Sequence, residues 1–552
     1  MNKIYDKTQQ AYFDWCNNPY YDVATREELH NLMDSNDIED RFCCDLCFGT
    51  GGLRGIMGAG TNRINTYTIR KVAYGIASYV LDLYPIGASV VVAFDTRLHS
   101  HEYASEIAAV LSAHNIAVHL FGEPVPTPLL SFATWHLGAS AGIMITASHN
   151  PKEYNGIKIY DADGVQLVPT KVTEAIKWIQ TVDACPPAAS PVSMLIVPVC
   201  TSIFSDFLQS VLTQSRNRLH NAALNVVYTP LHGAGLSLIT KILQMDGITH
   251  VTVVPEQREP NGYFPTVPTP NPEDPHALEL AIQMGISSGA DIVLGTDADS
   301  DRLGIGVLHN GAFQLLTGNQ IGALLLHFLL EFEPSGQLPG AMLIKTIVTG
   351  ALGTEIATHH GIQVIETPVG FKYIGEQVVK CLACSNNRFL MAYEESFGFL
   401  VGTHARDKDA VVAAMLICEA TAYWKAQRKT LIDVLNELYA QYGYFLDALQ
   451  TFTCPGSLGA EEIQSAMLTL RTLGMEVYPG CIQVIDYLCA SDSFPAENVL
   501  KWLLPDGSWF AARPSGTEPK IKFYFSIRGQ NEVDAVQRLD SLKTALFAHL
   551  NH

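Results

Sequence analysis

Short apolar runs alternate with amphipathic segments through the first third of the chain, and this alternation restricts the fold more than any other feature. Apolar residues recur at helical spacing over residues 69–83, and a β-branched run follows at 88–94. The pattern then continues with a helix at about 101–114, a strand at 117–121, a helix at about 127–137 and a strand at 141–146. Such alternation predicts a parallel sheet with helices on both of its faces.

The same pattern starts again after a proline-rich linker at residues 186–191. Later strands are expected at 224–228, 250–254, 291–294, 342–347, 363–366 and 389–393, with a helix at about 408–426. The last hundred residues differ, because strands at 509–512 and 520–526 flank a loop and a helix follows at about 532–549. A chain of 552 residues is also too long for one core. We therefore expect an α/β fold class, with three similar mixed α/β domains at 1–190, 191–310 and 311–440 and a smaller C-terminal α+β domain at 441–552.

The composition excludes several classes of function. A formal net charge of −20 argues against binding to nucleic acid or to an anionic membrane. No apolar run reaches the roughly 18 residues of a membrane span, and the N-terminus lacks a signal-peptide core, so we expect a soluble cytoplasmic protein. The 12 cysteines include two CxxC pairs, Cys44/Cys47 and Cys381/Cys384, without the histidine spacing of a zinc site. Reduced thiols are a better explanation for these cysteines than a zinc site shared between the two pairs.

A group of aspartates directly follows one expected strand. Asp297, Asp299 and Asp301 stand at the carboxyl end of that strand, where ligands bind in parallel α/β folds. In an extended segment this spacing points all three carboxylates to one side, and such like charges need a cation between them. Mg²⁺ prefers oxygen ligands of this kind. An EF-hand loop would need glycine and glutamate where Arg302 and Leu308 stand, so a solvated acidic turn is the remaining alternative.

A serine follows another strand. Residues 146–150 read Thr-Ala-Ser-His-Asn, which lacks the G-x-S-x-G pattern of serine hydrolases. Ser148 can simply cap a strand-to-helix turn. Beside a magnesium loop, however, a phosphorylated Ser148 would supply a further anionic oxygen to the metal. His149, Lys158 and Arg302 are then candidates to hold or titrate around the phosphoryl group.

Two more polar loops follow expected strands. Glu394 and Ser396 can hydrogen-bond the vicinal hydroxyls of a sugar, and a solvated loop is the alternative. In the last domain a guanidinium, two hydroxyls and open backbone N–H groups suit a bound phosphate, and a tight hairpin turn is the alternative. The residues of this last loop are Arg513, Ser515, Gly516 and Thr517.

Together these loops indicate phosphoryl transfer on a phosphosugar. With them the chain resembles the α-D-phosphohexomutases, the phosphoglucomutase and phosphomannomutase superfamily. The resemblance runs from residues 48–55, Phe-Gly-Thr-Gly-Gly-Leu-Arg-Gly, to the loop at 513–517, with the signature loops in the family's order. It implies an isomerase with four domains around a central cleft that holds the active site.

The resemblance also implies a role for each matching residue. Ser148 resembles the phosphoserine and, with Asp297, Asp299 and Asp301, forms the Mg²⁺ site. The other implied roles are phosphate contact or acid–base work for Arg54, His149, Lys158 and Lys408, a place beside the metal loop for Arg302, discrimination of sugar orientation for Gly370, sugar binding for Glu394 and Ser396, and binding of the non-reacting phosphate for Arg513, Ser515, Gly516 and Thr517.

The reaction of the family has two steps. Phosphorylated Ser148 gives its phosphoryl group to a hexose 1- or 6-phosphate, and the resulting bisphosphate turns around and returns its other phosphate to Ser148. For glucose, the resemblance implies glucose 1,6-bisphosphate as intermediate and activator. Closing of the fourth domain would exclude water from the phosphoserine. The implied partner is a small phosphosugar, and the implied state is a monomer or a homodimer.

Two departures bear on the substrate. The sugar loop reads Glu-Glu-Ser-Phe-Gly at 394–398, without the histidine of the smaller phosphomannomutase/phosphoglucomutases, and so resembles phosphoglucomutases. The long chain and the Asp-Ala-Asp-Ser-Asp-Arg loop resemble the subgroup that also contains phosphopentomutases and glucose 1,6-bisphosphate synthases. These activities stay as alternatives, as do a catalytically silent phosphosugar-binding relative and a Mg²⁺-dependent phosphatase.

Overall fold

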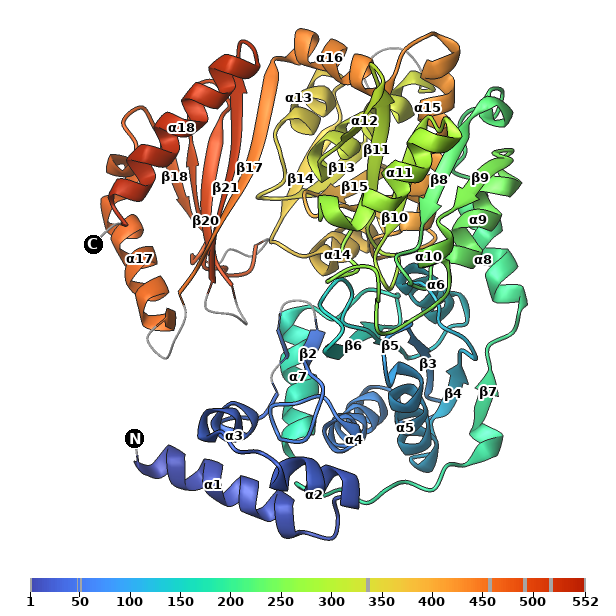
Figure 1. Ribbon diagram of the computed structural model, residues 1–552, viewed down its shortest axis with the longest axis vertical. Coiled ribbons are helices and arrows are strands. Elements are labelled where there is room, and N and C mark those ends of the chain that lie inside the picture. The colour runs from blue at the N-terminus through green and yellow to red at the C-terminus, as the bar shows by residue number, and fades with distance from the viewer. Residues whose placement is uncertain are drawn as a thin grey trace. The chain divides into compact units, whose positions relative to one another are not determined.

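A computed structural model describes residues 2–46, 48–49, 52–333, 338–454, 459–489, 494–515 and 520–550. The chain forms two compact units, whose elements are labelled in Figure 1. The first unit comprises Met1–Ser215, Asn221–Gly306 and Gly402–Met415. The second comprises Arg216–His220, Val307–Val401 and Leu416–His552.

The first unit begins with helices and a seven-stranded sheet. Its helices are α1 (Asn2–Asn17), α2 (Val23–His30), α3 (Ser35–Phe42), α4 (Thr66–Leu83), α5 (Ser100–Ala113), α6 (Thr127–His136) and α7 (Pro169–Gln180). Its strands are β1 (Phe48–Gly49), β2 (Gly52–Ile56), β3 (Ser89–Phe94), β4 (Ala117–Leu120), β5 (Ala141–Ile145), β6 (Tyr154–Asp161) and β7 (Ile196–Pro198). The strand order is β1-β2-β6-β5-β3-β4-β7. β3 is parallel to both β4 and β5, and β4 is parallel to β7.

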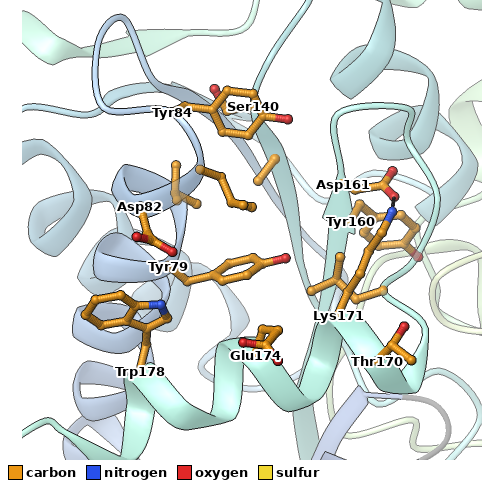
Figure 2. A pocket seen from close by; sticks show the side chains of 14 residues that line it. Tyr79, Asp82, Tyr84, Ser140, Tyr160, Asp161, Thr170, Lys171, Glu174 and Trp178 are labelled. Carbon is orange, nitrogen blue, oxygen red and sulfur yellow. Dashed lines mark hydrogen bonds and ion pairs between the residues drawn. The ribbon is translucent and has the colours of Figure 1, made fainter.

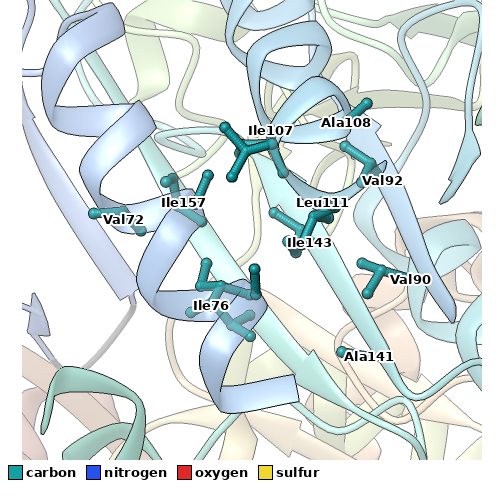
Figure 3. Packing of buried hydrophobic residues seen from close by; sticks show 14 of the residues in the cluster. Val72, Ile76, Val90, Val92, Ile107, Ala108, Leu111, Ala141, Ile143 and Ile157 are labelled. Atoms are coloured by element: carbon teal, nitrogen blue, oxygen red, sulfur yellow. The ribbon is translucent and has the colours of Figure 1, made fainter. Parts of the chain in front are cut away.

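Helices cover both faces of this sheet, as the sequence predicted. On one face Val90 and Val92 of β3 pack in a buried cluster with Ile76 of α4 and Ile107 of α5 (Figure 3). Val91 is equally buried but points to the opposite face, because side chains alternate along a strand. There α6 contacts β3 and β5. The sheet is therefore buried on both sides, and its polar chemistry is confined to its edges and loops.

One half of the sheet differs from the parallel arrangement that the sequence predicted. β6 is antiparallel to β5 and to β2, and Met144 stands opposite Lys158 in the register. The cause is the short connection of residues 146–153, since a parallel crossover needs about a dozen residues or more. Ser148 therefore lies in a strand-to-strand loop and not in a strand-to-helix turn.

A second sheet completes the first unit. Its elements are β8 (Asn225–Thr229), β9 (His250–Val253), β10 (Ile292–Thr296) and β11 (Leu303–His309), with α8 (Ser202–Leu212), α9 (Leu236–Met245), α10 (Pro255–Arg258) and α11 (Glu279–Ser288). The strand order of this five-stranded sheet is β12-β11-β10-β8-β9, in which β12 (Ala312–Leu315) belongs to the second unit, and β8 is parallel to its two neighbours. The loop between β10 and β11 carries the three aspartates. β11 begins in the first unit and ends in the second.

The second unit holds a mixed sheet and an antiparallel one. The first group is β12 (Ala312–Leu315), β13 (Ala341–Thr346), β14 (Gln363–Thr367), β15 (Arg388–Glu394) and β16 (Gly398–Val401), with α12 (Gly318–Glu331), α13 (Leu352–His359), α14 (Phe371–Leu382), α15 (Ala410–Ala426) and α16 (Leu431–Tyr442). The order of its sheet is β14-β13-β15-β16, with β13 parallel to β14 and β15 and β16 antiparallel to β15.

The antiparallel sheet lies in the C-terminal part. Its elements are β17 (Tyr444–Thr453), β18 (Gln483–Asp486), β19 (Leu500–Leu503), β20 (Trp509–Pro514) and β21 (Lys520–Gly529), with α17 (Gly459–Leu473) and α18 (Glu532–Ala548). The order is β17-β21-β20-β19-β18. Trp502 and Phe510 stack in its core with ring centroids 4.8 Å apart. The expected class, mixed α/β sheets with one α+β part, is confirmed. No helix in the described part of the chain is both long and apolar enough to cross a lipid bilayer.

Candidate active site

Ser148 is held in a tight loop of the first unit. Its backbone is left-handed, with φ of +51°, and only 1% of the residue is exposed. Its N–H donates to Oγ1 of Thr146 at 2.8 Å, and its Oγ donates to Oδ2 of Asp297 at 2.7 Å. Oγ also lies 3.2 Å from Nδ1 of His149. Because the hydroxyl has one hydrogen, making both contacts at once requires His149 to donate from Nδ1.

Arg97 fixes the backbone of the same loop. Its side chain is fully buried, and its guanidinium donates to four backbone carbonyls. The accepting carbonyls belong to Ser148 at 2.7 Å, Pro151 at 2.8 Å, Tyr154 at 3.0 Å and Asn150. Nε lies 3.5 Å from Oδ2 of Asp95. Sequence reasoning missed Arg97, although it follows the strand at 88–94 and so stands at the sheet edge where ligand loops were sought.

The three loop aspartates converge, as predicted. One carboxylate oxygen from each of Asp297, Asp299 and Asp301 lies within 4.8 Å of the others, and no other group of three such ligands occurs among the described residues. The predicted extended conformation is wrong. The N–H groups of Asp301 and Arg302 donate to Oδ1 of Asp297 at 3.1 Å, and Ser300 has φ of +50°, so the segment closes as a turn. All three aspartates are buried, which excludes a solvated acidic turn.

Two lysines and a threonine hold the aspartates. Nζ of Lys158 donates to Oδ2 of Asp299 at 2.7 Å and to Oδ2 of Asp301 at 2.9 Å. Nζ of Lys408 lies 3.3 Å from Oδ2 of Asp301, and Oγ1 of Thr127 donates to Oδ2 of Asp299 at 2.6 Å. Within the described residues, Oδ1 of Asp299 and Oδ1 of Asp301 have no hydrogen-bond partner. Buried acceptors without donors suit a hard divalent cation.

The surroundings move the pKa values of these carboxyl groups apart. Burial, followed by repulsion from the other two aspartates, raises the pKa of Asp297 well above its usual range. Burial also acts to raise the pKa of Asp301, but Lys158 and Lys408 outweigh it and hold that pKa well below the usual range. Asp297 is therefore the member of the group that takes up a proton most readily when no cation is bound.

The basic groups are shifted by the same surroundings. Burial alone would lower the pKa of Lys158, but Asp299 and Asp301 raise it above its usual value. Burial, with the positive charges of Arg302 and Arg54, lowers the pKa of His149 well below its usual value, so its imidazole is neutral. A neutral imidazole that carries its hydrogen on Nδ1 is able to accept a proton at Nε2.

The two arginines predicted for the site also lie beside it. Nη1 of Arg54, from β2, donates to Oδ1 of Asn150 at 3.1 Å, and its buried Nε has no hydrogen-bond partner among the described residues. Arg302 contacts Glu273 through Nη1 and lies 3.9 Å from Oδ1 of Asp301 through Nε. Both guanidinium groups therefore add positive charge around the Ser148 loop.

Lys408 also takes part in a second series of contacts. Its Nζ lies 3.3 Å from Oδ1 of Asp407, whose Oδ2 accepts from the Tyr160 hydroxyl at 2.7 Å. Asp409, by contrast, caps the start of α15, because its Oδ1 accepts the N–H of Val411 at 2.7 Å. No local sequence pattern indicates the contact between Tyr160 and Asp407, whose positions are 247 residues apart.

The second unit holds the predicted sugar-binding residues. Glu394 ends β15 and is buried, and Ser396 follows two residues later and is half-buried. Gly370 stands before α14 with φ of +123°, a conformation that favours glycine. Nearby, burial lowers the pKa of Lys372 to about 8. The structure thus places Glu394 and Gly370 at the carboxyl ends of β15 and β14, where a parallel sheet binds ligands.

The predicted phosphate loop connects two antiparallel strands. Arg513 lies near the end of β20, and the N–H of Ser515 donates to the carbonyl of Lys520 on β21 at 2.7 Å. Gly516 and Thr517 lie outside the described residues. The two strands expected on either side of the loop are confirmed as an antiparallel pair, and the tight turn and the phosphate contact both stay predictions.

A cluster of lysines in the second unit was not predicted. Nζ of Lys345 and Nζ of Lys501 lie 3.5 Å and 3.4 Å from the same atom, Oε1 of Glu366. Nζ of Lys501 also donates to the carbonyl of Ile347 at 2.7 Å. Burial lowers the pKa of Lys501 to about 8. Two buried ammonium groups share one carboxylate here, so the cluster favours an anion.

Known proteins resemble the chain over most of its length. Three domain families match in succession: "Phosphoglucomutase/phosphomannomutase, alpha/beta/alpha domain I" over residues 45–183, domain II over 204–310 and domain III over 317–442. A Staphylococcus aureus phosphoglucomutase is 35% identical over 533 residues, covering 93% of this chain and 95% of its own. A Staphylococcus haemolyticus phosphoglucomutase is 36% identical over 532 residues, covering 93% and 96%.

Solved structures share the fold. The open form of parafusin, a phosphoglucomutase from Paramecium, has a TM-score of 0.71 at 18% identity and covers 92% of this chain and 95% of its own. A phosphoglucomutase/phosphomannomutase family protein from Burkholderia thailandensis has a TM-score of 0.69 at 20% identity and covers 91% and 97%. The three domain matches and the two staphylococcal phosphoglucomutases confirm the family expected from the sequence.

Proposed function

Because the chain belongs to the phosphoglucomutase/phosphomannomutase family, we propose that it is a phosphosugar mutase that interconverts glucose 1-phosphate and glucose 6-phosphate through a phosphoserine at Ser148. One observation carries the assignment of the nucleophile. The Ser148 hydroxyl is buried and donates to Asp297, within a group of three converging carboxylates. The names of the relatives at 35–36% identity support glucose as the sugar.

We propose Mg²⁺ as the cation of this site. Asp297, Asp299, Asp301 and the phosphorylated Ser148 are the residues that would hold it. The fit rests on the donor set and on the two buried aspartate oxygens that lack hydrogen-bond partners within the described residues. When bound, Mg²⁺ neutralises negative charge on the transferring phosphoryl group.

The chain's own residues account for the rest of the transfer. In the first step the bond between phosphorus and Oγ of Ser148 breaks, and a bond forms between phosphorus and a hydroxyl oxygen of the sugar monophosphate. The sugar hydroxyl loses its proton to Nε2 of the neutral His149 imidazole, the proposed acceptor, and Nδ1 of His149, which lies 3.2 Å from Oγ, gives its proton to the departing serine oxygen. Lys158, Lys408 and Arg54 surround Ser148 and Asp301 with positive charge, which stabilises the oxygens of the group in transfer.

The second step is the reverse transfer from the opposite end of the intermediate. Glucose 1,6-bisphosphate transfers to Ser148 the phosphate that the substrate carried at the start. It therefore acts as the intermediate and, when added, as an activator. Glu394 and Ser396 are proposed to bind sugar hydroxyls, and Gly370 to belong to the loop that distinguishes the two orientations. The non-reacting phosphate is assigned to Arg513, Ser515, Gly516 and Thr517.

A mutase assay tests this function. With Mg²⁺ and a trace of glucose 1,6-bisphosphate, we expect rapid conversion of glucose 1-phosphate, compared with mannose 1-phosphate and ribose 1-phosphate. Ser148→Ala should lower the rate by about 10⁴-fold or more, as loss of a covalent nucleophile does in other enzymes. Ser105→Ala is the matched control and should keep full activity, because the Ser105 hydroxyl donates to the carbonyl of His101 on α5.

The outcomes separate the alternatives. A preference for ribose or mannose would keep the mechanism and change the substrate. Release of inorganic phosphate in excess of isomerisation would indicate a phosphatase. Absence of turnover by the phosphorylated wild type on all three sugars would overturn the mutase assignment and favour a silent phosphosugar-binding protein.

A further inference from the structure

One cavity of the first unit lies at the edge of its first sheet that is opposite to Ser148. The cavity has a volume of about 440 Å³ and is lined by residues of α4 and α7 (Figure 2). Its wall includes Ala141 at the start of β5 and Asp161 at the end of β6, whereas Ser148 lies in the loop at the other ends of these strands. None of the aspartates proposed to hold Mg²⁺ lines this cavity. A residue that acts on the proposed metal site is therefore expected at the Ser148 edge.

A segment of the first unit lies against the loop of the three aspartates at that edge. It comprises residues 259–273, between α10 and α11, and is called the strap below. Phe264 of the strap is 1% exposed and packs in a cluster with Ala298 of the aspartate loop. The guanidinium carbon of Arg97 lies 5.1 Å from the centroid of the Phe264 ring. The strap therefore contacts both the aspartate loop and the arginine that fixes the backbone at Ser148.

The strap is fixed near both of its ends. At its start, the carbonyl oxygen of Glu259 lies 3.2 Å from Nδ1 of the buried His232. Near its end, the backbone passes so close to Gly304 of β11 that a Cβ on this glycine would lie 2.4 Å from the carbonyl oxygen of Pro272. Backbone that is packed this closely has no room to shift. Glu273, the next residue, therefore has a defined place beside the aspartates.

Glu273 holds the side chain of Arg302. Nη1 of Arg302 donates to Oε1 of Glu273, and the N–H of Glu273 donates to Oδ1 of Asn271 at 3.1 Å. Nε of Arg302 lies 3.9 Å from Oδ1 of Asp301, which is beyond hydrogen-bond distance. That aspartate oxygen is buried and has no hydrogen-bond partner among the described residues. Without Glu273, the guanidinium would need to move only about 1 Å to donate to it.

A bond between Arg302 and Asp301 would compete with a divalent cation. A metal ligand must offer a free lone pair on its oxygen, and a guanidinium forms charge-assisted hydrogen bonds to carboxylates through several N–H donors. The positive charge of the guanidinium would also repel the cation. The position of Arg302 therefore decides whether Oδ1 of Asp301 is available to a metal.

We propose that Glu273 is a positioning residue for the metal site: it holds the guanidinium of Arg302 away from Oδ1 of Asp301, so that this oxygen stays open to a divalent cation. The inference rests on the proposed Mg²⁺ site. It does not depend on the mutase reaction, because its readouts are metal affinity and the position of a side chain.

Calorimetric titration with Mg²⁺ tests this role. Glu273→Met removes the acceptor, so we expect Mg²⁺ affinity to fall about tenfold, as when other residues that orient metal sites are replaced. Glu273→Gln keeps an uncharged acceptor, and neutral hydrogen bonds are about half as strong as charge-assisted ones, so affinity should fall only about threefold. Equal losses in the two variants would reflect the lost charge alone and would overturn the positioning role.

A matched control comes from the other end of the strap. Glu259 is exposed and lies 3.7 Å from Nε of Arg258, so Glu259→Met makes the same exchange beside an arginine that does not adjoin the aspartates. We expect its Mg²⁺ affinity to equal that of the wild type. A tenfold loss in this control as well would mean that any charge removed from the strap weakens binding, and would contradict a specific role for Glu273.

A double variant shows whether Glu273 acts through Arg302. Arg302→Met removes the competing guanidinium, so Mg²⁺ affinity should equal or exceed that of the wild type. Adding Glu273→Met to Arg302→Met should then change the affinity by less than about twofold, because the two residues act as one unit. A tenfold loss that persists in the double variant would show that Glu273 acts by its own charge or through folding, and would overturn the proposal.

A crystal structure of Glu273→Met without Mg²⁺ tests the position directly. We expect an N–H of Arg302 within about 3.2 Å of Oδ1 of Asp301. A guanidinium that keeps its wild-type distance from this oxygen would overturn the inference. Absence of Mg²⁺ binding by the wild type would instead mark failure of the proposed cation site, and this structure would still decide whether Glu273 positions Arg302.

Discussion

Lys158 in the first unit and Lys501 in the second are both buried lysines, yet their pKa values move in opposite directions. Burial acts to lower the pKa of each. Lys158 contacts two carboxylates, those of Asp299 and Asp301, which raise its pKa. Lys501 shares the single carboxylate of Glu366 with Lys345, and its pKa falls to about 8. The ratio of carboxylates to ammonium groups, and not burial, decides the direction in which the pKa of each lysine shifts.

This difference describes two kinds of binding site. In the first unit the carboxylates of Asp297, Asp299 and Asp301 converge and leave two buried oxygens without donors, which suits a cation. In the second unit the buried ammonium groups of Lys345 and Lys501 exceed the carboxylates in contact with them, which suits an anion. A phosphosugar mutase needs both kinds of site.

The largest effect on stability is expected for Lys158→Met. Removing this ammonium group leaves two buried carboxylates without their main partner, which should lower the free energy of unfolding by about 3–5 kcal/mol in the presence of a chelator. Urea unfolding followed by circular dichroism measures the change. Lys177→Met is the matched control, because its exposed pair with Glu174 should contribute less than about 1 kcal/mol. Equal losses in the two variants would refute the charge-balance argument for the first unit.

The next effect is expected for Arg97→Lys. Lysine has one ammonium group and cannot reach all four carbonyls that Arg97 holds, so Ser148 should lose its fixed position. A displacement of about 1 Å at a reacting group typically lowers the rate about 10²-fold. We expect kcat to fall by that order while KM changes little.

The control for Arg97 separates position from charge. Arg258→Lys makes the same exchange at an exposed site and should not change kcat. If Arg97→Lys were to raise KM and leave kcat unchanged, the loop would not depend on this arginine for its catalytic position.

Arg97 also shows the limits of prediction from the sequence. The strands, the helices and the convergence of the aspartates could be predicted, because hydrophobic periodicity and the position of polar residues after strands are local signals. The antiparallel β6 was missed because the pattern of a buried strand is the same in either direction. The contacts of Arg97 with residues 148–154, and of Tyr160 with Asp407, depend on how distant segments pack, and no local pattern encodes them.

A smaller effect is expected at Thr127, which holds the aspartate group from α6. Its hydroxyl donates to Oδ2 of Asp299, and its N–H donates to the backbone carbonyl of Asp299 at 2.8 Å. Thr127→Val keeps the shape and removes the hydroxyl, so we expect Mg²⁺ affinity to fall about tenfold, as when other residues that orient metal ligands are replaced. Calorimetric titration with Mg²⁺ measures it. Thr127→Ser restores the hydroxyl and should recover most of the affinity, and failure to do so would point to packing instead.

The smallest effect at neutral pH is expected for Lys501→Met. The variant loses the hydrogen bond to the carbonyl of Ile347 but also removes a buried ammonium group that Glu366 neutralises only in part. Glu366 keeps its contact with Lys345. Replacing a buried charged group by an apolar one of similar size is often neutral, so the change in the free energy of unfolding should stay within about 1 kcal/mol. A loss of stability as large as that of Lys158→Met would contradict the difference in charge balance between the two sites.

The pH dependence of stability in the wild type and in Lys501→Met tests the same difference in charge balance. Below pH 8 Lys501 is charged in both the folded and the unfolded chain, and the folded protein carries the full cost of burying the charge. Between pH 8 and its ordinary pKa of 10.5 the folded lysine is neutral while the unfolded one still binds a proton. The unfolded state then holds more protons, so the stability of the wild type rises with pH, and the methionine variant lacks this contribution. The free energy of unfolding of the wild type should therefore rise by about 2 kcal/mol relative to Lys501→Met between about pH 7.5 and about pH 9.5.

Urea unfolding of both proteins at several pH values measures this gain. A difference that stays constant with pH would mean that the lysine cluster of the second unit is as well neutralised as the centre of the first, and the contrast between a cation site and an anion site would no longer follow from charge balance.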